Sequence, residues 1–184
     1  VCEWDSGGDS TVVPTGDRLS LHSALFASTS LCMAHDYDDY LFMGHTGHSA
    51  VFTSLLLAEV LGLTPKDMLT AQVAANEVGG RMGASCVLGP QNGQLWTFIH
   101  LASSALSASK LYRLDREKTA NAIAISLYQP NFALYPGFMG PDAKLLSASM
   151  TSLGGLISAQ LARKGFTGPL DILENPRGFL AHFS

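Results

Sequence analysis

Residues 141–165 read PDAKLLSASMTSLGGLISAQLARKG. This stretch predicts one long helix from about Pro141 to Lys164, which ends at Gly165 after two basic residues. One apolar stripe on it is made of large side chains: Leu146, Met150, Leu153, Ile157 and Leu161. A second stripe is made of small ones: Ala148, Ser152, Gly155, Ala159 and Ala162. Small residues let a neighbouring helix approach closely, so we expect a helix buried on two faces inside a bundle.

Helix signals also dominate the rest of the chain. They lie in residues 18–34, 49–62, 64–82, 95–113 and 115–128. Thr64 followed by Pro65 is a strong helix start, and Asp115 is a good N-cap. A short β-like run occurs at residues 11–13, but sustained period-2 alternation is missing from the sequence. The prediction is an all-α helical bundle in which residues 1–184 form a single helical domain.

The composition excludes several classes of protein. Hydrophobic residues make up 47% of the chain and charged residues only 14%, whereas disordered chains are poor in the former. The 11 Lys and Arg are outnumbered by 15 Asp and Glu, which argues against a nucleic-acid partner. So few charges leave much surface without polar cover, and we expect part of it to contact another domain or subunit.

The cysteines and the apolar segments bear on location. Cys2, Cys32 and Cys86 are widely spaced and odd in number, which favours reduced thiols and a cytoplasmic protein. The densest apolar stretch, residues 50–63, is interrupted by polar side chains, so we expect no membrane partner. The sequence starts without Met or a signal-like segment, and we expect it to be a fragment of a longer chain.

Residues 35–48, HDYDDYLFMGHTGH, concentrate the titratable side chains. They contain three of the 15 acids and three of the 6 histidines. The segment lies between two predicted helices, where a loop can direct side chains into a shared cavity. It offers a base near neutral pH, carboxylates to orient that base, and glycines that allow a ligand close to the backbone.

Three interpretations of this cluster compete. The acids Asp36, Asp38 and Asp39 can cap helix ends while the histidines fill polar gaps. Alternatively, the His35-Asp36 pair can belong to a metal site of the HD-type hydrolases, although such a site needs further ligands on other helices. The third interpretation is acid–base catalysis without a metal.

The cluster and several later segments together resemble one known family. Asp36-Tyr-Asp-Asp-Tyr40 followed by Gly44-His-Thr-Gly-His-Ser-Ala-Val51 resembles the Asp-Phe-Asp-Asp-Thr and His-Pro motif of the 2-methylcitrate dehydratase family, called MmgE/PrpD. Residues 71–78 (AQVAANEV), the segment that begins at Lys144, and residues 165–174 (GFTGPLDILE) are similar to later motifs of that family. The order and spacing of these segments make the resemblance specific.

The resemblance implies a part of a larger protein. Members have a large all-helical domain and a smaller α/β lid, and they usually form homodimers. The first helices and the C-terminal lid are therefore expected to be absent from this chain. The shared chemistry is proton transfer next to a carboxylate of a small di- or tricarboxylic acid, without a metal or other cofactor. It leads to dehydration, decarboxylation or epimerisation.

The family pattern also assigns roles to residues. It implies Asp36 as a site-lining acid, His45 as the catalytic histidine and Lys144 as the lysine that binds the anionic substrate. Because the loop is one residue longer here, His48 is the alternative to His45. We also expect Tyr40, where the family has Thr, and His48 to contact the substrate.

Two positions depart from the pattern. The family's second active-site histidine falls near Gln94, which can bind a carboxylate or hydroxyl but is no base near pH 7. Ser147 replaces a histidine that often follows the lysine. These departures predict a different substrate or a different division of acid and base roles. His100 is expected to be a packing histidine.

The resulting hypothesis is a lyase or isomerase in which His45 exchanges the substrate proton, Asp36 orients it and Lys144 binds a carboxylate. It requires these three side chains to converge on one pocket. The alternatives are an isolated, non-catalytic helical dimerisation domain and the metal-dependent hydrolase.

Overall fold

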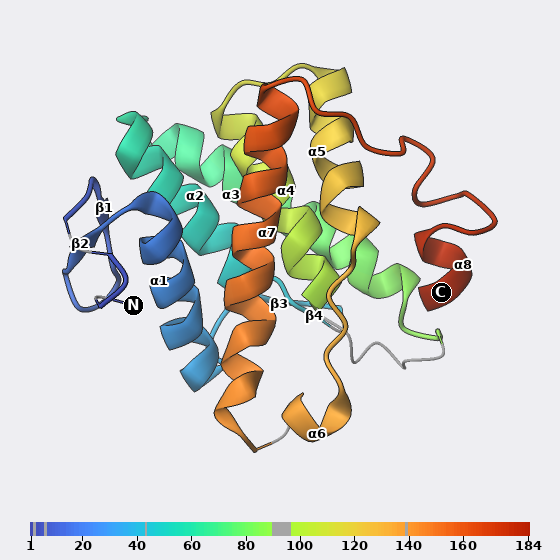
Figure 1. Cartoon of the computed structure of the whole chain (residues 1–184), viewed down its shortest axis with the longest axis horizontal. Helices are drawn as coiled ribbons and strands as arrows, with labels where there is room; N and C mark the ends of the chain where they lie inside the picture. Colours follow the sequence, from blue (N-terminus) through green and yellow to red (C-terminus); the bar gives the residue numbers. More distant parts are fainter. Residues whose placement is uncertain (2, 6, 43, 90–96, 139) are drawn as a thin grey trace.

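A computed structural model describes the chain except for residues 2, 6, 43, 90–96 and 139 (Figure 1). Along the described residues, the first seven α-helices are α1 Leu21–His35, α2 Gly47–Leu61, α3 Pro65–Ser85, α4 Thr97–Leu111, α5 Arg116–Tyr128, α6 Tyr135–Phe138 and α7 Leu146–Arg163. A short terminal helix, α8 Phe179–Phe183, and a 3-10 turn, η1 Asp142–Leu145, complete the set. The predicted all-α class is confirmed.

Two small antiparallel hairpins are the sheets among the described residues. Strand β1 Ser10–Thr11 pairs with β2 Arg18–Leu19, and the first of these overlaps the predicted β-like run. Strand β3 Tyr40–Leu41 pairs with β4 Gly44–His45, with Tyr40 opposite His45. The second hairpin lies between α1 and α2, where the acidic and histidine-rich segment was expected to form a loop.

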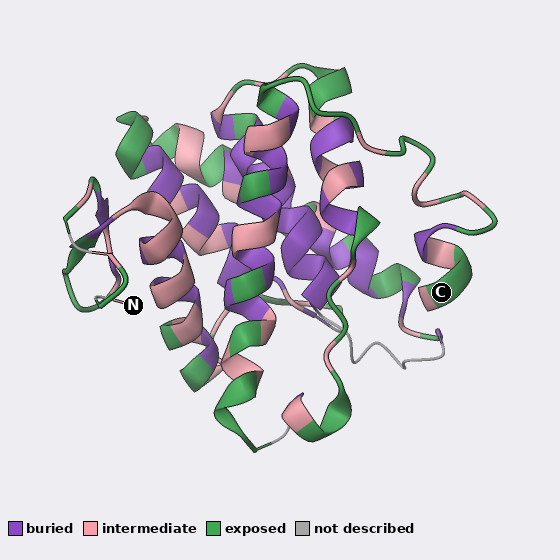
Figure 2. Cartoon of the chain, viewed as in Figure 1, coloured by how far each residue is buried: buried purple, intermediate pink, exposed green. Residues whose placement is uncertain are grey.

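Helix α4 is the centre of the bundle. It packs against α2, α3, α5 and α7, and nearly all of its residues are buried (Figure 2). Its many serines are tolerated there because their hydroxyls bond to the surrounding helices. Ser103 donates to the Ala75 carbonyl oxygen, and Ser104 donates to the Ser152 carbonyl oxygen. These bonds satisfy polar groups that would otherwise be costly to bury.

Helix α7 approaches α4 through its small stripe, as predicted. A Cβ atom on Gly155 would lie 2.4 Å from the Leu101 carbonyl oxygen, so only glycine fits this crossing. The stripe around it is buried: Ala148, Ser152, Ala159 and Ala162 are at most 1% exposed. The two backbones therefore meet closely.

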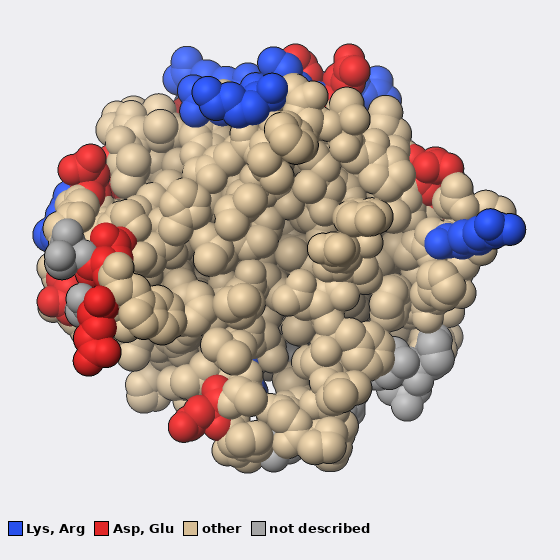
Figure 3. Space-filling model, in the orientation of Figure 1, with Lys and Arg blue, Asp and Glu red and all other residues tan. Residues whose placement is uncertain are grey.

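The prediction that α7 is buried on a second face is wrong for this chain. Leu146, Met150 and Ile157 of the large stripe are 47%, 48% and 40% exposed. Helix α7 crosses the front of the molecule, and no other described element covers that face (Figure 1). The middle of this face shows few charged side chains (Figure 3). The small stripe, although less apolar, faces the core because small side chains allow the two helix backbones to approach closely.

Helix starts follow the predicted local chemistry. Thr64 and Asp67 form a reciprocal capping box at the start of α3, with Pro65 in the first turn. The Asp115 carboxylate accepts a hydrogen bond from the Lys118 N–H at the start of α5. Glu77 and Arg81 pair one turn apart on α3, as their spacing predicts.

The stretch Asp142–Arg163 has the length and apolar character that would allow it to cross a membrane. Half of the 18-residue window on which this finding rests is buried inside the bundle, and core helices share these properties.

Neighbouring residues on α7 allow a test of this packing. Leu156 is fully buried, so we expect Leu156→Ala to lower the free energy of unfolding by about 2–5 kcal/mol. Ile157→Ala removes a similar volume from a 40% exposed position and should cost less than about 1.5 kcal/mol. Urea unfolding followed by circular dichroism measures both. Equal losses would contradict the assigned faces of α7.

Glu59 joins the first hairpin to α2 and makes stability depend on pH. It accepts hydrogen bonds from the Thr11 N–H, the Thr11 hydroxyl and Arg18. Burial alone raises the pKa of Glu59, but these bonds outweigh it and hold the pKa below its ordinary value of 4.5.

A carboxylate with a depressed pKa stabilises the fold above its unfolded pKa, and this contribution is lost as the pH falls through the folded pKa. We therefore expect the native chain to be more stable than Glu59→Gln at neutral pH, and the difference to shrink below pH 4.5. Urea midpoints at both pH values provide the measurement. A difference independent of pH would show that Glu59 acts only through neutral hydrogen bonding.

Candidate active site

The end of α1 starts the site. Asp36 caps this helix in the left-handed conformation, with φ of 53°, and its N–H donates to the Cys32 carbonyl oxygen. The chain then turns through residues 37–39 into the β3–β4 hairpin and enters α2 at Gly47. This short connection carries Asp36, Asp38 and His45, and His48 follows in the first turn of α2.

The acidic loop is fixed to the start of α2. The Asp38 Oδ2 atom accepts a hydrogen bond from the His48 N–H (3.2 Å), and the Asp39 carbonyl oxygen accepts one from the Thr46 N–H (2.9 Å). A negative carboxylate is favoured at a helix N-terminus, where N–H groups lack partners within the helix. Gly47 permits this contact, since a Cβ atom there would lie 2.6 Å from the Asp39 nitrogen.

The third acid of the segment faces elsewhere. Asp39 Oδ2 accepts hydrogen bonds from Asn76 (3.0 Å) and Gln72 (3.4 Å), both on α3. Asp39 is exposed and fixes the loop against that helix. It therefore supports the position of Asp38 without entering the cluster itself.

Lys144 reaches the cluster from the other end of the chain. Its Nζ atom lies 2.8 Å from Asp36 Oδ2, across 108 positions of sequence. Lys144 sits in η1, directly before α7, and its ammonium group also lies 5.6 Å from the centre of the Phe138 ring. The N-terminal end of α7 thus lies next to the C-terminal end of α1.

His45 bonds to a carboxylate that was not among the predicted catalytic residues. Its Nδ1 atom is 2.6 Å from Asp38 Oδ1 and 3.6 Å from Asp36 Oδ1. The Asp38 side chain is 2% exposed, whereas that of Asp36 is 32% exposed. Asp38, rather than Asp36, therefore orients the His45 ring.

His48 lies beneath His45. The two rings stack nearly parallel, with centroids 5.6 Å apart. The His48 side chain is fully buried, whereas that of His45 is 17% exposed. A molecule that enters from solvent can therefore reach His45 first, which favours His45 over His48 as the group that meets a substrate.

A deeper layer supports His48. Its Nδ1 atom is 3.1 Å from the Cys32 Sγ atom. Burial, followed by the charges of Asp38 and Asp36, raises the pKa of the Cys32 thiol to about 11, so the thiol stays protonated. His100 lies behind His48, with ring centroids 5.7 Å apart, and its Nδ1 atom is 3.1 Å from the Ser49 hydroxyl.

The two deeper imidazoles are neutral. Burial lowers the pKa of His48, and the carboxylates of Asp38 and Asp36 only partly oppose this effect. Complete burial lowers the pKa of His100 well below its ordinary value, and the nearby His48 and His45 add to the effect. His100 is thus buried among helices, in the manner expected of a packing histidine.

Asp36 is held in its ionised form. Burial on its own raises the pKa of Asp36, but the hydrogen bond from Lys144 and the nearby His45 lower it below the ordinary 3.8. The site therefore contains an ionised carboxylate next to an ammonium group at neutral pH. Such a pair can exchange partners with an incoming carboxylate.

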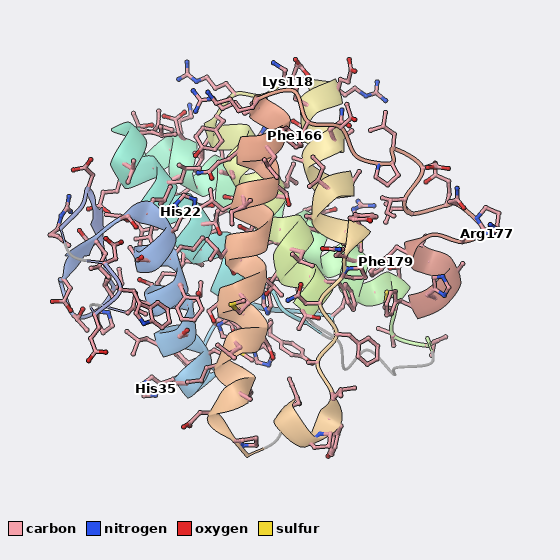
Figure 4. All side chains as sticks on the ribbon, viewed as in Figure 1. His22, His35, Lys118, Phe166, Arg177 and Phe179 are labelled. Atoms are coloured by element: carbon pink, nitrogen blue, oxygen red, sulfur yellow. The ribbon has the colours of Figure 1, made fainter. Side chains whose placement is uncertain are left out.

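The remaining predicted residues are placed less centrally. Tyr40 is 54% exposed and packs edge-on against His45, with ring centroids 5.0 Å apart. Gln94 lies outside the described residues. His35 is exposed at the end of α1 (Figure 4) and does not join the other ligands, so the structure does not assemble an HD-type pair.

One donor atom each of Asp36, Asp38, His45 and His48 lies within 4.8 Å of the others, a grouping able to hold a metal ion.

The family model of the MmgE/PrpD N-terminal domain matches residues 1–184. The chain belongs to the MmgE/PrpD family. None of the curated proteins compared with it matches significantly. Membership in MmgE/PrpD supports a role of the dehydratase or lyase type at the level of the family.

Sequence reasoning missed two contributors to this MmgE/PrpD site. Asp38 was counted among the acids of the cluster but was given no catalytic role, although its carboxylate bonds to His45. Cys32 was considered only as a reduced thiol. It lies in the last turn of α1, four residues before the C-cap Asp36, and this nearness in sequence was the available signal that it lies close to the cluster.

Gly47 provides a test of the loop geometry. Gly47→Ala would place a methyl group 2.9 Å from the Asp38 Cβ atom, so the acidic loop must move away from α2. We expect a loss of about 1–3 kcal/mol in unfolding free energy and a weakened Asp38–His45 hydrogen bond. Urea unfolding measures the first, and the chemical shift of the His45 Nδ1 proton in NMR spectra measures the second.

Gly137→Ala is the matched control, because its new methyl group would meet nothing closer than 3.9 Å. An unchanged His45 signal in Gly47→Ala would contradict the steric role of Gly47.

Proposed function

We propose that the chain is the helical part of a lyase or isomerase that removes a proton next to a carboxylate of a small di- or tricarboxylic acid. The supporting observation is the convergence of His45 and Lys144 on the Asp36 carboxylate in a chain of the MmgE/PrpD family. The reaction requires a base and a cationic group, and His45 and Lys144 provide them on either side of the Asp36 carboxylate.

His45 is the proposed base. When its Nδ1–H donates to Asp38, the tautomer is fixed and the lone pair resides on Nε2. The Asp38 carboxylate also stabilises the imidazolium that forms once Nε2 takes the proton. This is the arrangement by which a buried acid orients a catalytic histidine.

Lys144 is the proposed anion-binding group. Its ammonium carries three donors, and Asp36 occupies only part of this capacity. A substrate carboxylate can therefore bind Lys144 while Asp36 keeps the side chain in position. The positive charge stabilises the negative charge that builds up on the carboxylate during proton removal.

The proposed step moves one proton and one electron pair. The C–H bond next to the carboxylate breaks, the proton passes to His45 Nε2, and the electron pair delocalises onto the carboxylate bound to Lys144. Return of a proton to the opposite face gives epimerisation, whereas loss of a β-hydroxyl group gives dehydration. In the epimerisation and dehydration routes, the first step is the same.

Proton–deuterium exchange tests the shared first step. We expect the chain in D2O to exchange the proton next to the carboxylate of methylcitrate, as followed by NMR. Lys144→Ala and His45→Gln should each slow this exchange about 100-fold or more, because one removes charge stabilisation and the other removes the base. Lys164→Ala, at the exposed end of α7, is the control and should leave the rate unchanged.

Each outcome separates the enzyme from a non-catalytic helical domain. Exchange that survives both site variants would overturn the assignment of His45 and Lys144. A lack of exchange with methylcitrate, cis-aconitate and related acids at high protein concentration would favour the non-catalytic domain.

A further inference from the structure

We propose that Asp36, Asp38, His45 and His48 form a binding site for Zn²⁺. The site cannot hold Zn²⁺ and catalyse proton transfer at the same time. The four donor atoms come from one segment of 13 residues and lie within 4.8 Å of one another. Two imidazoles and two carboxylates are a common ligand set for this ion.

The donor spacing fits a small tetrahedral ion. Zinc bonds to nitrogen and oxygen are about 2.0–2.1 Å long, which places tetrahedral donors about 3.3 Å apart. His48 Nε2 lies 3.4 Å from both Asp36 Oδ1 and Asp38 Oδ1, and His45 Nδ1 lies 3.6 Å from Asp36 Oδ1. The hydrogen-bonded pair of His45 and Asp38, at 2.6 Å, must open to admit the ion, and donors that lie up to 4.8 Å apart must move closer together.

In three of the four proposed ligands, the side-chain atom that does not face the ion is in contact with another group of the protein. Asp36 Oδ2 bonds to Lys144, Asp38 Oδ2 accepts the His48 N–H, and His48 Nδ1 faces the Cys32 thiol. In each case, the atom directed into the cluster is the one not used by the outer contact. Outer hydrogen bonds of this kind orient metal ligands and strengthen metal binding.

Two buried polar atoms in the cluster lack a well-formed hydrogen bond. Asp36 Oδ1 and His48 Nε2 are buried and lie 3.4 Å apart, and neither has a hydrogen-bond partner of good geometry. The His48 side chain is fully buried, so solvent cannot satisfy its nitrogen. Buried polar atoms without a partner destabilise a fold, and a cation between these two atoms would satisfy both.

Charge and donor type select the ion. The two carboxylates outnumber the one ammonium group of Lys144, which contacts the outer oxygen of Asp36. The cluster is therefore negative when both imidazoles are neutral. Mg²⁺ and Ca²⁺ prefer oxygen donors alone, whereas two imidazole nitrogens favour Zn²⁺.

Metal binding would prevent His45 from acting as a base. This consequence rests on the proposed function. A neutral imidazole that binds Zn²⁺ through Nδ1 carries its proton on Nε2. Nε2 of His45 then has no lone pair with which to accept the substrate proton. The same four residues would thus switch between a proton-transfer site and a metal-blocked site.

Direct binding tests the site without using activity. Isothermal titration of the untagged, metal-stripped chain with Zn²⁺ should show one site per chain, and Co²⁺ should give the visible absorption of a tetrahedral complex. Asp38→Asn and His45→Gln should weaken Zn²⁺ binding at least about tenfold, since each removes one ligand. The control, His35→Gln, removes an exposed histidine next to Asp36 and should bind as the native chain does.

Circular dichroism spectra establish that each variant is folded, and two variants at different positions guard against the failure of one. Zn²⁺ should also raise the melting temperature of the native chain, because it binds only the folded state. No binding by the native chain, or equal binding by all variants, would overturn the proposed site. Equal affinity for Mg²⁺ would contradict the assigned ligand set.

Activity separates the two proposals. Zn²⁺ should suppress deuterium exchange, and a chelator should restore it. Exchange that continues at saturating Zn²⁺ would overturn the mutual exclusion. Zn²⁺ binding in a chain that exchanges no proton would support the metal site and count against the proposed function alone.

Discussion

The close contact between α4 and α7 at Gly155 is the constraint on which the rest of the structure depends. No side chain fits between Gly155 and the Leu101 carbonyl oxygen, so the backbones of the two helices set the crossing. Close approach then makes the buried serines of α4 useful, because their hydroxyls reach the carbonyl oxygen of a facing helix. The direction of α7 is fixed by this contact.

The same contact determines where the chemistry lies. Helix α1 packs against α7 and against η1, the turn that carries Lys144. The end of α1 carries Asp36, so the two helix ends meet and their opposite charges pair. A change in the α4–α7 crossing would therefore shift Lys144 relative to Asp36.

The site combines an outer, wetter layer with a dry inner one. Asp36, Lys144 and His45 are partly exposed, whereas Asp38 and His48 are almost completely buried. The inner layer sets the orientation of the outer one, because Asp38 bonds to the His45 ring and Cys32 contacts His48. His45 connects the proton-transfer proposal to the metal proposal, because it is both the proposed base and one of the four proposed ligands.

The sequence by itself determined the helical class, the helix starts at Thr64 and Asp115, and the family. Caps and periodicity are local, and the order of the family motifs is written along the chain. It also identified Asp36, His45 and Lys144, whose proximity the structure bears out, while their catalytic roles stay predictions.

Only the tertiary structure decided which stripe of α7 is buried, because close helix packing favoured the small stripe over the more apolar large one. It also decided that Asp38 orients His45 and that His48 is buried beneath it. These outcomes depend on the hairpin pairing and on contacts between residues far apart in sequence, which helix periodicity and motif spacing do not encode.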